Sequence, residues 1–458
     1  MVTPIYGPRQ CSASLKEFLA SLLSNAEQDK EKTKVAKLKA ILQAEYMKDL
    51  WPKIRKYAKG EICSGLDQVE IPTHDSDEEI TGWRSVTTPA ELFQTLLARN
   101  ISHFAQAKDT PFVAGTLGHQ LHPFAQNQFS ESILNGAADL SNLHLSASIH
   151  DCIQEMCFPP GEDGSGPVSD IISPEDFSNG FKLLSEDLSS SPSGHHIGHY
   201  KAALGDDELC TLYATILSLP FKHGFTLHRW TSAVQVMLEK TKGCARIDKR
   251  AIRLLEADLN MALRIIFSCR LIQRAEDCGT IPLFQWGSWP TRSSTDAILL
   301  KCLSYDGLSL LRHSAIIFNN ECKAAFDCMV PSIGGIALCC LGASSAAVST
   351  LLQTLQQMKY NVWKMLGVSE RSFSNKDDWV LGTLQGSGAS LCLWLAITCM
   401  LLGALRQRSQ GITFRNPQGT IECNRIGEAY VDDTELWLTM HDKDITQLAA
   451  EMQDIAQY

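Results

Sequence analysis

The hydrophobic and polar positions of this chain fall into two kinds of pattern, which predict helices and strands. Apolar residues recur at helical spacing, with Lys and Glu between them, over Ser14–Gly60 and again over Thr87–Ala107. Thr88 and Glu91 have the spacing of a capping box, and Pro89 suits the first helical position. We expect Ser14–Gly60 to be either a core helix or a helix that binds a partner.

Shorter apolar runs predict strands. Val234–Leu238 and Ile252–Leu255 flank the polar turn Lys242–Ile247, so we expect a two-stranded ribbon. His313–Phe318 is apolar enough for the centre of a sheet. Gly427–Leu436 contains β-branched and aromatic residues around a pair of aspartates, and this pattern predicts a β-hairpin with two acids at its tip.

The apolar run Val380–Leu405 has no charged side chain and is long enough to cross a bilayer. Its first part, Leu381–Ser390, is rich in glycine and polar residues, and lipid would leave that backbone without hydrogen bonds. We therefore expect a loop that leads into a buried helix, Leu391–Leu405, and no membrane partner. A further helix is expected over Asp258–Ile272, whereas Cys63–Glu79 is polar and irregular.

Two breaks rich in Pro, Gly and Ser divide the chain. Pro159–Pro167 is the stronger linker signal, and Ser189–Gly194 precedes the region that carries the candidate chemistry. We expect an α+β protein built from four regions: a helical segment at residues 1–60, an N-terminal extension at 61–185 with a linker near 159–169, and two further regions at 186–300 and 301–458.

The composition indicates a globular intracellular protein. The 458 residues are 44% hydrophobic and 20% charged, which allows two or three domains with real cores. The sixteen cysteines form no CxxC pair, and no secretory leader is visible at Met1–Gln10, so we expect reduced thiols. These features do not distinguish nucleus from cytoplasm, and they say nothing of the oligomeric state.

The net charge of −10 argues against a nucleic-acid-binding protein, but the distribution of charge favours one. Residues Lys222–Arg274 include eleven basic and four acidic side chains, a local net charge of +7. Such a segment is typical of a surface that contacts phosphates, and the alternative is a solvated helix face. His195, His196 and His199 lack further metal ligands nearby, so we expect them to be structural or to contact phosphate.

Asp432 and Asp433 are the strongest candidates for chemistry. Adjacent carboxylates repel each other unless a cation neutralises them, and two-metal phosphoryl transfer uses such pairs. The alternative is a solvated Asp-Asp turn. Glu321 lies at the end of the predicted strand, where a carboxylate could complete a split metal site with the pair. Asp327 would lie about 20 Å farther along an extended chain, so we expect it to cap the next helix.

Six segments, in this order, resemble the motifs of reverse transcriptases, and most closely those of non-LTR retrotransposons. The resemblance covers roughly residues 190–437. In chain order the segments are Ser191–Lys201, Arg246–Asn260, Gln285–Asp296, Asn320–Asp327 (motif A), Gly382–Ser390 (motif B) and Ala429–Asp433 (motif C).

The resemblance implies a right-hand fingers–palm fold, with residues 186–300 as the fingers and pre-palm region and residues 301–458 as an incomplete palm with an antiparallel sheet. It implies DNA synthesis from deoxynucleoside triphosphates on an RNA template with a DNA primer. Asp432, Asp433 and Glu321 would then be the catalytic metal ligands for two Mg²⁺ ions, with Mn²⁺ as an alternative.

The resemblance also implies a nucleotide-binding set. The Phe326 ring would lie against C2′ of the sugar and exclude a ribonucleotide hydroxyl. Gln385 and Gly386 would begin the loop that contacts the incoming nucleotide and the template. Lys240 and Arg250 would grip the triphosphate.

Three departures from the family pattern lead us to expect a truncated or impaired copy. Glu321 stands where the family has Asp, and its extra methylene moves the carboxylate by about 1.5 Å, where a misplacement of about 1 Å can cost roughly 10²-fold in rate. The chain stops at Tyr458, so we expect no thumb, and Trp289 stands where the family tends to have Arg. The alternative function is a catalytically inactive, reverse-transcriptase-like protein that binds nucleic acid.

Overall fold

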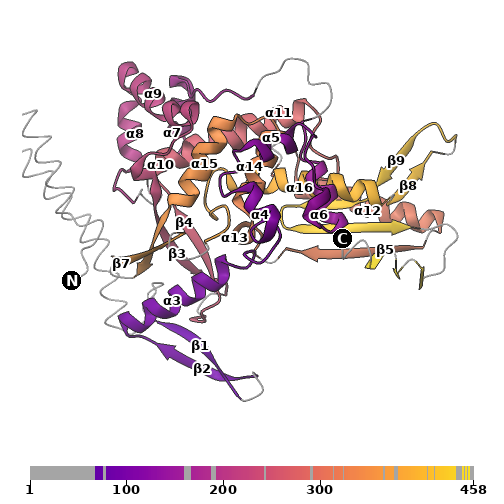
Figure 1. Ribbon diagram of the computed structural model, residues 1–458, viewed down its shortest axis with the longest axis horizontal. Helices are drawn as coiled ribbons and strands as arrows, with labels where there is room; N and C mark the ends of the chain where they lie inside the picture. The colour runs from indigo at the N-terminus through magenta and orange to yellow at the C-terminus, as the bar shows by residue number, and fades with distance from the viewer. Residues whose placement is uncertain are drawn as a thin grey trace, which may run out of the picture.

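Helices and four small β-sheets make this a mixed protein of α and β structure, with antiparallel and mixed sheets (Figure 1). The computed structural model describes residues 68–453 except 76–78, 159–166, 187–191, 242–243, 289–291, 313, 323, 365–366, 376–379, 410, 417, 440–445, 448 and 451. The predicted helix Ser14–Gly60, nearly all of the predicted linker and Trp289 lie outside the described residues.

The first half of the described chain is mainly helical. Its elements are β1 (Val69–His74), β2 (Ile80–Val86), α3 (Pro89–Phe104), α4 (Gly115–Leu121), α5 (Gln128–Leu134), η1 (Ser141–Leu143), α6 (Ala147–Gln154), α7 (Pro174–Lys182), α8 (Ile197–Ala203), α9 (Asp207–His223) and η2 (His228–Thr231).

The second half alternates between strands and helices. Its elements are β3 (Ser232–Glu239), β4 (Lys249–Leu254), α10 (Ala257–Leu263), η3 (Arg264–Leu271), α11 (Ile272–Asp277), α12 (Ser294–Leu311), β5 (Ala315–Glu321), α13 (Ala325–Cys328), α14 (Pro331–Cys340), α15 (Ser345–Gln357), β6 (Lys359–Lys364), β7 (Gly367–Ser374), α16 (Ser390–Arg408), β8 (Ile412–Arg415), β9 (Glu422–Arg425), β10 (Gly427–Tyr430) and β11 (Asp433–Thr439).

The prediction of irregular chain at Cys63–Glu79 is wrong where β1 forms an antiparallel hairpin with β2. The turn of the basic ribbon stabilises this hairpin: the Glu70 amide donates to the Ala245 carbonyl at 2.9 Å, and the Ile247 amide donates to the Glu70 carbonyl at 2.9 Å. The strand thus has a local partner, β2, and a single isolated bridge to a residue some 175 positions away.

Helix α3 begins at Pro89, as predicted, but the predicted capping box does not form. Thr88 occupies the N-cap position without a side-chain hydrogen bond. The Glu91 carboxylate instead pairs with Arg84 of β2, with Nη1 and Oε1 2.5 Å apart. The side chain that would complete the box is therefore used to join the helix to the hairpin.

The predicted ribbon is confirmed: β3 and β4 pair antiparallel, with Val236 opposite Ile252. The ribbon belongs to a larger sheet with the strand order β4-β3-β6-β7, in which β3 pairs parallel with β6. The main hydrophobic core continues from this sheet through the surrounding helices, including α9, α14 and α15.

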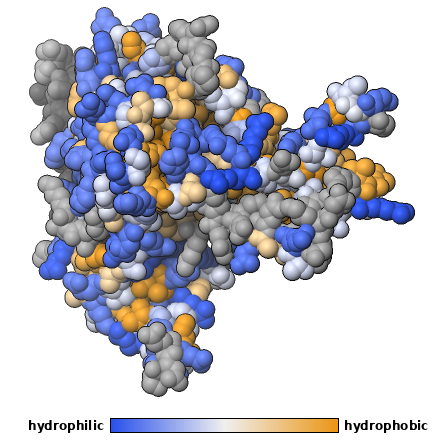
Figure 2. Space-filling model, turned by 45° about the vertical axis from the view of Figure 1, so that its right-hand side comes forward, coloured by the Kyte–Doolittle hydropathy of each residue, from blue (hydrophilic) through white to orange (hydrophobic). Residues whose placement is uncertain are grey.

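A second sheet, with the order β10-β11-β5, lies in the arm at the right of Figure 1. Leu402 and Leu405 of α16 pack with Leu436 and Leu438 on one face of this sheet. Helix α12 approaches the other face, where Leu308 belongs to a cluster with Trp437. Figure 2 shows this arm projecting from the body of the molecule, with hydrophilic side chains interrupted by hydrophobic patches.

Helix α16 confirms the predicted loop and buried helix. Among the described helices it alone has the length and apolar composition to cross a membrane, and 61% of that window is buried inside the protein. Its residues pack against α14, α6 and the second sheet. This is the packing of a core helix, and no membrane partner is indicated.

Candidate active site

Strand pairing brings Glu321 next to the aspartate pair. β5 and β11 run antiparallel with Glu321 directly opposite Asp433, and the Cys322 amide donates to the Asp432 carbonyl at 3.1 Å. Directly opposed residues project from the same face of a sheet, so the carboxylates of Glu321 and Asp433 are neighbours. Both side chains are exposed, and Asp432 is half-buried in the turn. Acids separated by more than a hundred residues thus meet at one end of the sheet.

The tip of the hairpin is the two-residue turn Val431–Asp432 between β10 and β11. Val431 has φ 56°, a left-handed conformation that is unfavourable for a β-branched residue. Trp394 of α16 donates its indole N–H to the Val431 carbonyl. Gly287 packs against the same residue so closely that a Cβ there would lie 2.3 Å from the Val431 nitrogen. The turn is therefore held in a strained conformation from two sides.

The segment before α12 hydrogen-bonds to β10, at the edge of the hairpin. The Ala429 amide donates to the Phe284 carbonyl at 2.9 Å, and the Trp286 amide donates to the Ala429 carbonyl at 2.8 Å. Gln285, fully buried, donates to Thr398 of α16 at 2.8 Å. The Gln285–Asp296 segment, noted in the sequence for its resemblance to a motif, thus lies beside the acidic hairpin.

The donor set at this end of the sheet consists of carboxylate oxygens, which Mg²⁺ prefers. Within the part of the chain that the structure describes, no three His, Cys, Asp or Glu side chains converge on one point as a metal cage. Mg²⁺ is commonly held by one or two protein carboxylates together with substrate phosphates and water. Glu321 and Asp433 fit that incomplete arrangement. The expectation of two ions stays a prediction.

The sheet face that carries Asp433 is strongly acidic and partly covered. Glu428 and Glu435 oppose each other across β10 and β11, two residues along each strand from Tyr430 and Asp433. Lys301 of α12 forms an ion pair with Glu435. Burial raises the pKa of Glu428 to about 7, and an ion pair with Arg425 opposes this rise. The sequence did not predict that Lys301 and Arg425 would neutralise these two glutamates.

A pocket of about 260 Å³ opens on this face, between α12 and the hairpin. Asp433, Tyr430 and Glu435 line it from the hairpin, and Lys301 and Trp286 line it from the preceding segment. A cation and an aromatic ring therefore lie beside the carboxylate of Asp433. The helical pattern of α12 does not identify Lys301 as part of a site.

Phe326 lies on α13, directly after the strand that ends at Glu321. Its carbonyl accepts a hydrogen bond from the Thr383 amide at 2.8 Å. Gly382 has φ 95°, and a Cβ there would lie 2.7 Å from the Phe326 oxygen, so this close approach requires glycine. The Phe326 ring lies 6.1 Å from the ring of Trp394, the residue that also bonds the hairpin tip. Trp394 therefore connects the segments that contain Phe326 and Asp432.

The same glycine-rich loop, which contacts α13 through Thr383, contacts the ribbon through Gln385–Gly388. The Arg253 amide of β4 donates to the Gln385 carbonyl at 2.9 Å, and Gly386 has φ 111°. A Cβ on Gly386 would lie 2.7 Å from the Arg253 carbonyl oxygen. Asn260 accepts a hydrogen bond from the Gly388 amide. The glycine-rich loop thus bridges α13 and the ribbon.

The two ribbon cations differ in availability. Lys240 is exposed, but its Nζ lies 2.8 Å from both carboxylate oxygens of Asp248, and this bond lowers the pKa of that carboxyl. Arg250 is also exposed, and it forms no ion pair with the described residues. Of these two residues, Arg250 is therefore the one whose charge has no acidic partner among the described residues.

The histidines near the start of α8 act as helix caps. The Gly198 amide donates to Nδ1 of His196 at 3.1 Å, and the His196 amide donates to Nδ1 of His199 at 2.9 Å. Both rings therefore satisfy amides at the first turn. This agrees with the structural interpretation of these residues rather than with a metal site.

The expectation that Asp327 caps the next helix is wrong. Asp327 lies within α13, and Val330 occupies the N-cap position of α14. The Asp327 side chain is buried, and its Oδ2 lies 2.9 Å from Nε2 of His103. Because α13 ends at Cys328 after a single turn, the cap position falls three residues later than the sequence spacing indicated.

The sequence matches no known family model and no curated protein.

Proposed function

We propose that this chain is an RNA-directed DNA polymerase domain of the mobile-element type, with a fingers–palm fold and impaired activity. The observation that carries the proposal is the register of β5 and β11, which pairs Glu321 with Asp433. The contacts of the glycine-rich loop with both α13 and the basic ribbon support it. In this interpretation the sheet β10-β11-β5 is the palm and the ribbon is part of the fingers.

In this proposal Glu321, Asp432 and Asp433 would hold Mg²⁺ together with the phosphates of the incoming nucleotide. The bound metal supplies charge neutralisation and lowers the pKa of the primer hydroxyl. Arg250 binds the triphosphate and stabilises negative charge on the leaving pyrophosphate. Phe326 restricts the space beside C2′ of the sugar, and the loop at Gln385–Gly386 positions the base pair.

Glu321 limits the expected rate, because a carboxylate one methylene farther from the backbone is displaced by about 1.5 Å from the position of an Asp. The restoring substitution Glu321→Asp should therefore raise primer extension by about 10-fold or more. Asp432→Asn should abolish extension in both backgrounds, because it removes a charge that the metal requires.

The experiment is primer extension on an RNA template with the full chain, in Mg²⁺ and in Mn²⁺. Asp306→Asn is the matched control, because Asp306 is an exposed acid on α12 that does not line the pocket beside Asp433. We expect weak extension by the unmodified chain, more with Glu321→Asp, and none with Asp432→Asn. Extension that survives Asp432→Asn, or the absence of any gain from Glu321→Asp, would contradict the proposal.

A second candidate is a nucleic-acid-binding protein without catalysis. The ion pair between Lys301 and Glu435 favours it, because α12 then partly covers the acidic face that a primer terminus would have to reach. A binding protein would bind single-stranded RNA with strong salt dependence. Its affinity would fall with Arg250→Ala but not with Asp432→Ala, and Glu321→Asp would restore no extension.

A further inference from the structure

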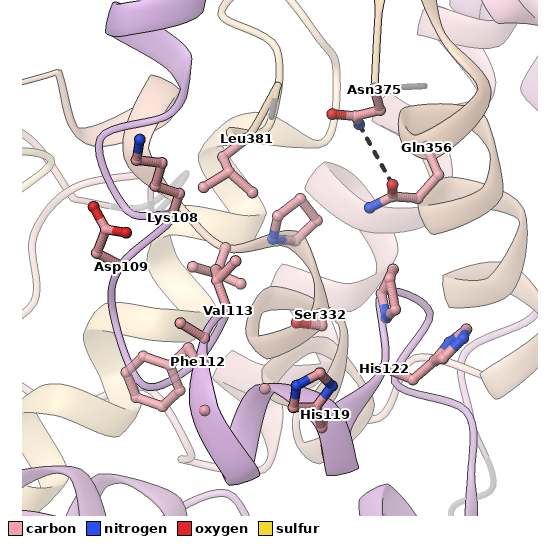
Figure 3. A pocket seen from close by; sticks show the side chains of 16 residues that line it. Lys108, Asp109, Phe112, Val113, His119, His122, Ser332, Gln356, Asn375 and Leu381 are labelled. Atoms are coloured by element: carbon pink, nitrogen blue, oxygen red, sulfur yellow. Dashed lines mark hydrogen bonds between the residues drawn. The ribbon is translucent and has the colours of Figure 1, made fainter. Parts of the chain in front are cut away.

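A second pocket lies away from the acidic hairpin, at the N-terminus of α14 (Figure 3). It has a volume of about 800 Å³. The segment after α3 and helix α4 form one side, the first turn of α14 forms another, and Leu381 and Asn375 close the remainder. A volume of this size is within the range of pockets that hold small organic ligands.

The first turn of α14 faces this pocket with unsatisfied donors. Its N-cap residue, Val330, has no side chain that could accept a hydrogen bond, and Pro331 occupies the first helical position. The amides of the following residues, Ser332 and Ile333, lack acceptors within the helix, as in any first turn. Because Val330, Pro331 and Ser332 all line the pocket, this positive end of the helix opens onto it.

Ser332 provides a second and independent indication of a ligand. Only 5% of its surface is exposed, yet it lines the pocket. Its hydroxyl makes no hydrogen bond with any residue that the structure describes, and Figure 3 shows the side chain at the centre of the site. The hydroxyl is therefore open to the pocket and can donate to a ligand that accepts from it.

The basic side chains on the rim match an anionic ligand. Lys108, His119 and His122 line the pocket and offer N–H donors, and Asp109 is the acid among the lining residues. In Figure 3 the two histidines lie near Ser332, whereas Asp109 lies on the far side of Phe112 and Val113. An anion at the helix terminus would therefore meet imidazole and hydroxyl donors before it meets the carboxylate.

The rest of the pocket suits a ligand larger than a simple anion. Phe112 and Leu381 give it apolar walls. Asn375 donates to Gln356 at 3.4 Å, and the two amides form a polar edge at the opposite end from the histidines. An aromatic ring for stacking and amides for edge-on hydrogen bonds are the usual means of holding a nucleobase.

We propose that this pocket binds a nucleotide, with its phosphate at the N-terminus of α14 and against the Ser332 hydroxyl. The nucleotide is either a free mononucleotide or one unit of a single-stranded chain. The pocket is separate from the acidic hairpin, so the proposal does not depend on polymerase activity.

The test is calorimetric titration of the full chain with adenosine 5′-monophosphate in EDTA, which removes binding that needs a divalent metal. Ser332→Asp places a carboxylate where the phosphate would lie, and an acid in the first turn of a helix favours the fold. We expect this variant to bind at least about 10-fold more weakly, because like charges at close range cost about 1.4 kcal/mol or more. The matched control is Ser345→Asp, at the exposed first position of α15.

A second pair of variants tests the site without altering the helix terminus. His119→Gln with His122→Gln should weaken binding several-fold, whereas His223→Gln, at an exposed histidine of α9 that does not line the pocket, should leave it unchanged. Inorganic phosphate should compete with the mononucleotide. If a short single-stranded RNA competes, the ligand is one nucleotide unit of a nucleic-acid strand. If the RNA does not compete, the ligand is the free mononucleotide.

The proposal is overturned if neither the mononucleotide nor the RNA binds in EDTA, or if Ser332→Asp and the double histidine variant both bind as tightly as the unmodified chain. Thermal unfolding of each variant shows whether weaker binding merely reflects a loss of structure. Failure of primer extension would leave this result unaffected, because the readout is binding at a different place.

Discussion

The acidic hairpin β10–β11 and the basic ribbon β3–β4 are both antiparallel pairs, and both carry charges along their strands. They differ in how those charges are compensated. In the hairpin, acids lie on one face and receive cations from elsewhere, namely Lys301 of α12 and Arg425 of β9. In the ribbon, alternation sends Lys249 and Arg253 inward and Arg250 outward.

This difference shows that the number of charges in a segment says little about how many are available to a ligand. The basic segment Lys222–Arg274 has a net charge of +7, yet Lys249 and Arg253 of its ribbon are buried, and Lys240 has a carboxylate partner. In the hairpin, by contrast, Asp433 keeps its carboxylate exposed at the tip. Strand position therefore decides which charges a ligand can reach.

The largest effect on stability should come from the inward-facing arginine of the ribbon. Arg253 is fully buried, with its guanidinium carbon 3.8 Å from the centre of the Phe104 ring and 4.5 Å from that of Tyr360. Arg253→Ala would leave a cavity between the rings, so we expect the free energy of unfolding in urea to fall by about 3 kcal/mol.

Arg250→Ala is the matched control for that substitution, because it lies on the same strand and faces outward. It should change the unfolding free energy by less than about 0.5 kcal/mol. Similar losses of unfolding free energy in the two variants would show that the buried position of Arg253 does not make it more important for stability than the exposed Arg250.

The next largest effect should come from the residue packed against the hairpin tip. A Cβ at Gly287 would lie 2.3 Å from the Val431 nitrogen, so Gly287→Ala must displace backbone. We expect a loss of about 2 kcal/mol in unfolding free energy. Gly205→Ala serves as the control, because its nearest neighbour would lie 3.8 Å away. If the two substitutions cost the same, the tip is not held by close packing.

A pH-dependent effect should come from Glu428 in the hairpin. Burial raises its pKa to about 7 from the ordinary value of 4.5, so the folded protein binds a proton that the unfolded chain releases between these values. The stability from this proton is complete below pH 4.5 and is lost as the pH rises towards 7.

Glu428→Gln should remove that loss, and the variant should gain about 1–2 kcal/mol relative to the unmodified chain between pH 5 and pH 7.5, a value reduced by solvent screening. Urea unfolding at a series of pH values measures this difference. Parallel pH profiles for the two proteins would rule out a role for this carboxyl.

The smallest effect should come from the exposed ion pair of the ribbon. Lys240→Ala removes the pair with Asp248, in which both side chains are more than half exposed. Exposed pairs contribute little, so we expect a change below about 0.5 kcal/mol in unfolding free energy. A larger loss would place this lysine in a structural role and weaken the comparison with Arg250.

Local patterns predicted the elements whose own residues carry a clear periodicity or turn signal. The ribbon, the strand that ends at Glu321, helix α16 and the Asp-Asp hairpin all follow from periodicity and turn residues. Strand β1 was not predicted, although it pairs with its neighbour β2, because its six residues include Pro72, which argues against a strand. The capping box failed for a different reason, since Arg84 of the neighbouring strand takes the carboxylate of Glu91.

The candidate site divides in the same way. Its acids were visible in the sequence because an adjacent Asp pair is unusual, and Glu321 was visible because it ends an apolar run. Trp394 and Lys301 were not visible, because each lies on a helix whose pattern is explained by packing alone. Their roles depend on which face of the second sheet each helix covers, and this is a property of the tertiary fold.

Residues Arg264–Leu271 form a π-helical stretch between α10 and α11. Each turn there holds more residues than an α-helix, and Ser268 donates from this stretch to the Gly388 carbonyl at 2.5 Å. Removing one residue would allow a regular α-helix but would rotate all later side chains by about 100° about the axis. The π-helical turn therefore sets both the orientation of the side chains of α11 and the contact of Ser268 with the glycine-rich loop. Deletion or insertion of one residue in this helix would disrupt that contact.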